Sequence, residues 1–136
     1  MKKIFDEVRS LDKRAIEKFH LTEDILMENV SIGLKNYITK KYKKNSSILI
    51  VCGSGNNGAD GISLARLLQN KFEVSLYLVS EPKTDIGKLQ LKRAKSINVN
   101  FVNKIFQADV VVDCLFGTGL NKELDEDSLF LINSLN

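Results

Sequence analysis

The chain has 136 residues, of which 43% are hydrophobic and 27% are charged, so a single domain can bury a core without disulfides or structural zinc. Its 20 lysine and arginine residues and 17 acidic residues are mostly interleaved, so the net charge of +3 does not indicate a nucleic-acid partner. No apolar run reaches the roughly 20 residues of a membrane span, and the first residues lack an apolar signal core, so we expect a cytoplasmic protein with no membrane partner.

The two cysteines and the single histidine exclude several kinds of site. Cys52 and Cys114 show no CxxC spacing, and each lies in an apolar stretch, where cysteine usually behaves as a small buried hydrophobe. Because His20 is the only histidine, a multi-histidine metal site within the chain is excluded and a serine hydrolase triad is not indicated.

Helices and short apolar strands alternate along the chain. Two helices are predicted first, over residues 10–19 and 22–40, with Thr22 as the N-cap of the second. The apolar run 48–52 then predicts a strand covered on both faces. The remaining predicted elements are a helix over 62–70, a strand over 72–79, a helix from Thr84 to about residue 97 with its basic side chains in water, strands over 98–102 and 109–116, and a helix over 125–135.

This alternation predicts one α/β domain over residues 1–136, with a three-layer, Rossmann-like parallel sheet, helices on both faces and two N-terminal helices. In the usual doubly wound order, the strands 48–52 and 109–116 lie side by side where the winding direction reverses. The loops that follow them are therefore expected to border one crevice. A hydrophobic strand 109–116 at the sheet edge indicates an incomplete sheet or self-association, such as a homodimer.

The loop after the first strand reads GSGNNGADG and contains the pattern G-x-G-x-x-G at Gly53, Gly55 and Gly58. Glycines let backbone N–H groups approach an anionic oxygen at a helix N-terminus. These glycines alone favour a nicotinamide-dependent oxidoreductase, in which Glu81 after the second strand would accept from the ribose.

Three polar side chains in the same loop argue against an ordinary dehydrogenase. Asn56, Asn57 and Asp60 fill the loop with amide and carboxylate oxygens, and Asp60 would repel a bound pyrophosphate. Such oxygens suit a hard cation, and Asp60 could instead accept from substrate hydroxyls. The alternative is that asparagine and aspartate stand here only as good turn and N-cap residues.

The loop after the fourth strand, DCLFGTGL, has the same character. Asp113 follows three valines, so its carboxylate lies at the end of a buried strand and needs a partner. Gly117 and Gly119 permit a close backbone approach, and Thr118 offers a hydroxyl. Capping by Asp113 and a plain turn at the glycines are the alternatives.

Three segments together resemble the YjeF N-terminal family of NAD(P)H-hydrate epimerases. They are Leu26-Met27-Glu28-Asn29, the loop GSGNNGADG at 53–61 and the loop DCLFGTGL at 113–120. The resemblance extends from about residue 11 to residue 120, and the paired loops are highly specific. The local departures are Val30-Ser31, where the family often has Ala-Gly, and Ala59, where a glycine is usual.

The resemblance implies an isomerase that interconverts the R and S epimers of hydrated NADH and NADPH (NADHX and NADPHX). A fused or separate dehydratase would then restore the reduced cofactor. The resemblance also implies a potassium ion (K+) beside the substrate, with Asn57 and Asp113 as ligands. The substrate contacts that it implies are Asn56, Asn57, Gly58, Ala59 and Asp60 in the first loop, and Gly117, Thr118, Gly119, Leu120, Asn121, Lys122 and Glu123 in the second.

One part of the family pattern has no counterpart in the sequence. The family continues into a further strand and an S-x-D-x-P-S-G segment, which supplies an acidic residue and another potassium ligand, and nothing after Leu120 resembles it. We therefore expect a C-terminally truncated chain whose catalytic acid or base lies beyond Asn136, and which is not a competent epimerase alone. A non-catalytic module that binds a nucleotide or a protein partner is the alternative from another class.

Overall fold

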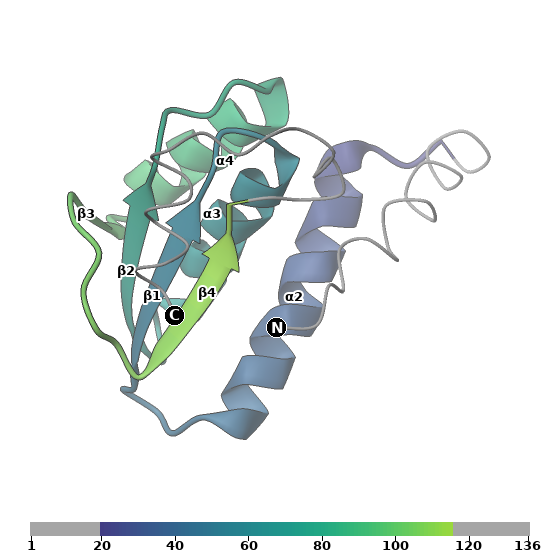
Figure 1. The fold of residues 1–136 in the computed structure, drawn as a ribbon. Helices are drawn as coiled ribbons and strands as arrows, with labels where there is room; N and C mark the ends of the chain where they lie inside the picture. Colours follow the sequence, from purple (N-terminus) through teal and green to yellow (C-terminus); the bar gives the residue numbers. More distant parts are fainter. Residues whose placement is uncertain (1–19, 116–136) are drawn as a thin grey trace.

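The computed structural model describes residues 20–115, in which helices and parallel strands alternate (Figure 1). In chain order the elements are α2 Glu23–Lys41, β1 Ser47–Cys52, α3 Asn56–Leu68, β2 Glu73–Leu78, α4 Asp85–Ser96, β3 Asn100–Val102 and β4 Val110–Cys114. The helices predicted over 10–19 and 125–135 lie outside the described residues. The α/β alternation predicted from the sequence is confirmed.

The four strands form one parallel sheet in the order β3-β2-β1-β4. Since β4 pairs with β1, with Ile48 opposite Val110 and Cys52 opposite Cys114, the predicted neighbourhood of the first and fourth strands is confirmed. Helices α3 and α4 lie behind the sheet in Figure 1, and α2 packs against α3. Because the chain runs from β1 outward to β2 and β3 and then returns to place β4 on the other side of β1, the winding direction reverses between β1 and β4.

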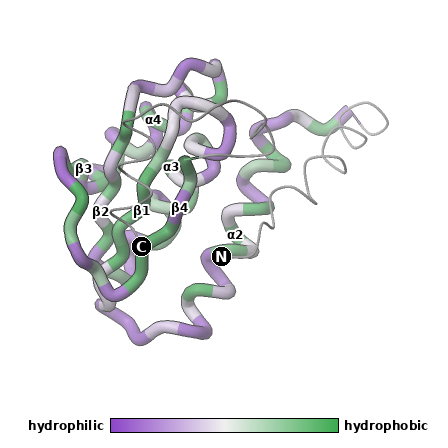
Figure 2. Tube along the Cα trace, viewed as in Figure 1, coloured by the Kyte–Doolittle hydropathy of each residue, from purple (hydrophilic) through white to green (hydrophobic). Residues whose placement is uncertain are grey.

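The core lies between the sheet and α3. Strand β1 is buried almost throughout, as predicted for a strand covered on both faces. Strand β4 is different: Val112 is 6% exposed whereas Val111 is 36% exposed, because alternate residues of a strand point to opposite faces. The prediction that the whole valine run is buried is wrong at Val111. Figure 2 shows hydrophobic residues concentrated along the strands.

The sequence-based boundary of α3 is wrong. Residues 53–61 were expected to form a loop before a helix at Ile62, but the helix begins at Asn56. A Cβ at Gly58 would lie 1.9 Å from the Gly53 carbonyl oxygen, and one at Gly61 would lie 2.6 Å from Cys52 Sγ. The glycines therefore let the first turns of α3 press against β1, and this packing outweighs the roughly 1 kcal/mol by which glycine disfavours a helix.

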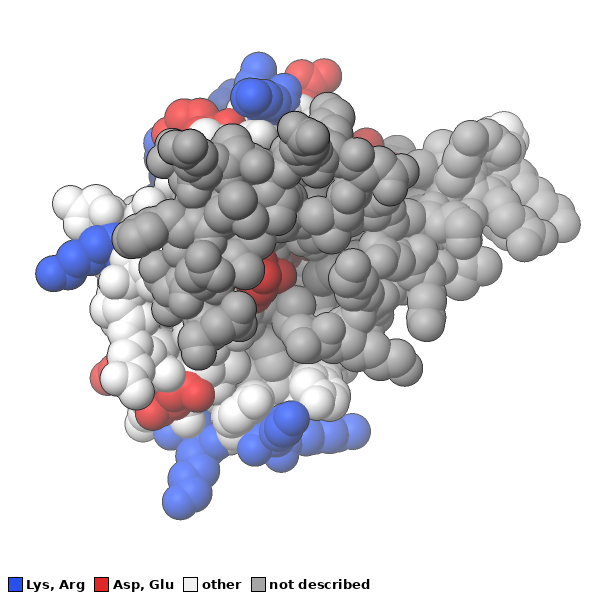
Figure 3. All heavy atoms as spheres, viewed as in Figure 1, with Lys and Arg blue, Asp and Glu red and all other residues white. Residues whose placement is uncertain are grey.

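The predicted helix starts and the surface charges follow the sequence pattern. Thr22 Oγ1 accepts from Ile25 N at 3.4 Å at the start of α2, and Thr84 Oγ1 accepts from Gly87 N at 3.1 Å at the start of α4. The N-cap predicted at Thr22 and the helix start predicted at Thr84 are confirmed. On the face in Figure 3, the described lysine and arginine side chains lie in separate groups around the rim, with acidic groups near several of them.

The close approach of α3 to the sheet predicts opposite effects for two glycine-to-alanine substitutions. Gly61→Ala places a methyl group against Cys52 Sγ and Cys114 Sγ, so we expect a loss of about 1–3 kcal/mol in the free energy of unfolding. Gly33→Ala is the matched control in α2, where no atom of the described chain would come within 4 Å of the new Cβ, and we expect a gain of about 0.5–1 kcal/mol. Urea unfolding followed by circular dichroism measures both, and equal stability of the two variants would contradict the packing argument.

Candidate functional site

The carboxyl ends of β1 and β4 bring the two candidate loops together. Gly53 N donates a hydrogen bond to the Cys114 carbonyl oxygen at 3.1 Å. A Cβ at Gly53 would lie 2.5 Å from the Leu115 carbonyl oxygen, so only glycine allows this contact. The prediction that both loops follow neighbouring strands at one sheet edge is confirmed as far as Leu115.

Helix α3 begins at this edge, and no side chain caps its N-terminus. Gly55 is the N-cap residue and makes no side-chain capping bond. The first N–H groups of a helix have no partner within the helix, and they carry the positive end of its dipole. The start of α3, beside the end of β4, is therefore suited to an anionic group of a ligand.

The polar side chains at the start of α3 point inward. Asn57 is 5% exposed and Asp60 is 7% exposed, and a spacing of three residues places them on one side of the helix. Gly58 and Ala59 are also buried, whereas Asn56 is half-buried. Since Asn57 and Asp60 are buried helical residues, the interpretation of them as turn residues is wrong.

Asp113 is half-buried near the end of β4. Its Oδ1 accepts from Leu115 N at 3.0 Å, so its carboxylate already has a backbone partner, and the capping alternative describes this contact. Cys114 faces α3, where it meets Gly61, so strand alternation places Asp113 on the other face of the sheet. The bond to Leu115 directs the carboxylate along the strand, toward the carboxyl edge.

A third loop adjoins this edge. Lys83 N donates to the Ser54 carbonyl oxygen at 3.0 Å, which joins the loop between β2 and α4 to the loop before α3. Glu81, the ribose acceptor of the oxidoreductase alternative, is exposed in this third loop. The predicted substrate contacts Gly117, Thr118, Gly119, Leu120, Asn121, Lys122 and Glu123 lie outside the described residues.

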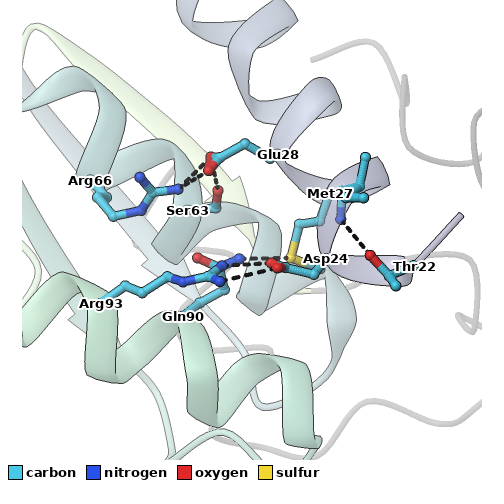
Figure 4. A network of polar contacts seen from close by, with 9 residues as sticks. Thr22, Asp24, Met27, Glu28, Ser63, Arg66, Gln90 and Arg93 are labelled. Atoms are coloured by element: carbon cyan, nitrogen blue, oxygen red, sulfur yellow. Dashed lines mark hydrogen bonds and ion pairs between the residues drawn. The ribbon is translucent and has the colours of Figure 1, made fainter.

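The sequence analysis missed two ion pairs that hold α2 across α3 and α4 (Figure 4). Arg93 on α4 donates to Asp24 on α2, with Nη1 2.5 Å from Oδ1 and Nη2 3.0 Å from Oδ2. This pair holds the pKa of Asp24 below its usual value, chiefly through the hydrogen bond from Arg93. The prediction that all basic side chains of this helix face water is wrong for Arg93, which is half-buried.

The second ion pair joins Glu28 on α2 to Arg66 on α3. Arg66 Nη2 contacts both carboxylate oxygens, at 2.5 Å for Oε2, and Ser63 Oγ donates to Oε1 at 3.5 Å. Here one guanidinium nitrogen meets both carboxylate oxygens, whereas the Arg93–Asp24 pair is bidentate, with two nitrogens on two oxygens, and so fixes orientation more strictly. Glu28 had been recognised only as part of a motif, because its partner lies on another helix and no local spacing reveals it.

The cysteines are confirmed as small buried residues of the core. Cys52 and Cys114 are opposite each other on β1 and β4, and each is fully buried. Burial raises the pKa of the Cys52 thiol, and the neighbouring Cys114 and the charge of Asp60 raise it further, so the thiol stays protonated. In residues 20–115, no group of three or more histidine, cysteine or acidic residues could hold a metal ion.

The fold and this edge define a Rossmann-like α/β protein whose candidate site lies where the sheet reverses direction. The chain belongs to the family described as YjeF-related protein N-terminus, which matches residues 23–136. The family resemblance seen in the sequence is therefore confirmed.

Similar proteins with curated names fall into two groups. The chain is 36% identical over 132 residues to a bifunctional NAD(P)H-hydrate repair enzyme Nnr of Helicobacter pylori, an alignment that covers 92% of this chain and 28% of that protein. It is 31% identical to the Nnr enzyme of Dictyoglomus turgidum, over 90% of this chain and 26% of that protein. It is 33% identical to an NAD(P)H-hydrate epimerase of Lentilactobacillus buchneri, over 96% of this chain and 64% of that protein. The chain thus spans less than two thirds of each of these relatives.

The lowered pKa of Asp24 predicts how one ion pair responds to acid. A carboxylate whose pKa is lower in the folded state adds stability above its unfolded pKa, near 3.8, and loses it as the pH falls through the folded value. We therefore expect Asp24→Asn to be less stable than the parent at pH 7, and the difference to shrink as the pH falls below 3.8. Because the Asp24 side chain is 38% exposed, the difference at pH 7 should be about 1 kcal/mol or less. Urea unfolding from pH 7 to pH 2.5 measures it, and a difference that grows in acid would contradict the assignment.

Proposed function

We propose that this chain forms the NAD(P)H-hydrate epimerase domain of a nicotinamide nucleotide repair enzyme. Its reaction would interconvert the R and S epimers of hydrated NADH and NADPH. The observation that carries the proposal is the family match over residues 23–136, together with relatives named as NAD(P)H-hydrate epimerases. The uncapped start of α3 at the reversal point of the sheet supports it, because that position suits an anionic dinucleotide.

The substrate would lie across the start of α3. Backbone N–H groups there would bind an anionic oxygen, and the polar side chains of Asn56, Asn57 and Asp60 would contact the nucleotide or the hydrated ring. Residues 117–123 would contribute the opposite wall. The acid or base that acts on the hydrated carbon is not assigned to any residue of this chain, and we propose that it lies beyond Asn136.

Asn57 and Asp113 would hold a potassium ion. Their amide and carboxylate oxygens are the ligand type that hard cations prefer. Because Asp113 leaves β4 on the face opposite α3, the proposed ion would lie beyond the carboxyl end of β4 and not between the sheet and α3. When bound, the ion would offset acidic charge near an anionic substrate.

The repair sequence requires a dehydratase, either fused to this domain or separate. The Helicobacter pylori relative is named as a bifunctional repair enzyme, and this chain matches 28% of it, which supports the fused arrangement. Within residues 20–115, the helices lack the combination of length and apolar content that a membrane crossing needs. We place the reaction in the cytoplasm, where NADH and NADPH are used, and propose no nucleic-acid partner.

Epimerisation is the direct test of the proposed function. The protein, produced as its gene encodes it, should interconvert the two hydrate epimers, resolved by chromatography. Asp60→Asn and Asp113→Asn should each lower kcat/KM about tenfold or more, because each removes a charged partner from the site. Asp109→Asn is the matched control: Asp109 lies before β4 at the opposite end of the sheet, where its Oδ2 accepts from Ser47 N at 2.9 Å. A parent protein that leaves the epimer ratio unchanged would refute the proposal, as would equal losses in all three variants.

Potassium binding has a readout that does not depend on activity. An ion that binds only the folded protein raises its unfolding midpoint as the ion concentration rises. We expect a higher thermal midpoint in potassium chloride than in lithium chloride at equal ionic strength, and we expect Asp113→Asn to abolish the difference. Calorimetry measures both, and the same difference in Asp113→Asn as in the parent would exclude Asp113 as a ligand.

A further inference from the structure

The first turns of α2 and α3 are joined by one side-chain hydrogen bond. Asn56 Nδ2 donates to Glu23 Oε1 at 3.1 Å. Glu23 is exposed in the first turn of α2, and Asn56 is half-buried at the first position of α3. The bond therefore links α2 to the first residue of α3, which lies at the candidate site.

The chemistry of Glu23 fixes which way the Asn56 amide faces. The nitrogen and oxygen of an asparagine amide are hard to distinguish by position alone. An ionised carboxylate only accepts hydrogen bonds, so it must face the NH2 group. Since the amide is planar, its oxygen then points away from Glu23.

That oxygen lacks a hydrogen-bond donor. Asn56 Oδ1 is buried and has no hydrogen-bond partner in the described part of the chain. A buried acceptor without a donor is unfavourable, so a hydroxyl or an amide N–H that reached it would be bound favourably. A hydrated nicotinamide dinucleotide carries donors of both kinds.

We propose that Glu23 is a positioning residue that holds the Asn56 amide with its oxygen toward the substrate. This inference rests on the proposed function, in which Asn56 contacts the substrate. Glu23 can act in this way because the ion pairs of Asp24 with Arg93 and of Glu28 with Arg66 hold its helix in place (Figure 4). An exposed glutamate on an unrestrained helix would not fix a neighbour.

Three substitutions at Glu23 separate orientation from other effects. Glu23→Ala removes the acceptor and frees the amide, so KM for the hydrate should rise about fivefold, the worth of one hydrogen bond, with little change in kcat. Glu23→Gln keeps an accepting oxygen and should restore most of the affinity. Glu23→Lys offers only donors, so it should attract Oδ1, turn the amide over and raise KM further than Glu23→Ala.

Glu73→Ala is the control, since it also truncates an exposed glutamate but lies at the first position of β2, at the opposite end of the sheet from the candidate site. It should leave KM unchanged. In an Asn56→Ala background, Glu23→Ala should have no further effect on KM, because the group that it orients is gone. Thermal unfolding of each variant verifies that it is folded under the assay conditions.

The outcomes are distinct. A parent protein that does not epimerise the hydrates refutes the proposed function. An active parent in which Glu23→Ala and Glu73→Ala change KM equally, or in which Glu23→Lys binds as well as the parent, refutes the role of Glu23 and leaves the function standing. We expect KM to be highest for Glu23→Lys, lower for Glu23→Ala, and lowest of the three for Glu23→Gln.

Discussion

The approach of α3 to the strands β1 and β4 is the constraint on which the rest of the structure depends. Gly58 lies against the Gly53 backbone, and Gly61 lies between the sulfur atoms of Cys52 and Cys114, so any Cβ would push the helix away. Because the helix starts so close to the sheet, its N-terminus stands directly beside the end of β4. The same glycines thus close the core and place the positive end of the helix dipole at the candidate site.

Helix α2 packs against α3 and is joined to α3 and α4 by ion pairs, which reinforces this arrangement. Its contacts with α3 and α4 combine two partly exposed ion pairs with a small apolar cluster of Met27, Ala59 and Ile86. Exposed ion pairs contribute little free energy, but paired guanidinium and carboxylate groups define an orientation. Asp24 and Glu28 therefore set the position of α2 on α4 and α3 more than they add to stability, and the first turn of α2 stays beside the first turn of α3. Met27 adds stability by burying apolar surface in the cluster.

The sequence was sufficient for the order of the elements, because periodic apolar runs and the caps Thr22 and Thr84 are local signals. It also predicted that β1 and β4 are neighbours, because chain connectivity restricts parallel sheets to few orders. It failed at the start of α3, where glycines and asparagines predict a loop and tertiary packing makes a helix. The contacts of Glu28 with Arg66 and of Glu23 with Asn56 could not be predicted from the sequence either, because they depend on how two helices cross.

The charges at the carboxyl edge are the physical reason for proposing a cation in the site. Asp60 is nearly buried and Asp113 is half-buried, and both stand at the edge where an anionic dinucleotide would bind. The dipole of α3 supplies only about half a positive charge there, so it cannot offset two carboxylates and a pyrophosphate together. A single monovalent ion between amide and carboxylate oxygens would reduce that repulsion. It would not need the tightly held ligands that a divalent metal requires. The acidic side chains at this edge argue against the dinucleotide site of an ordinary dehydrogenase. They are compatible with a dinucleotide substrate when a cation binds beside the substrate.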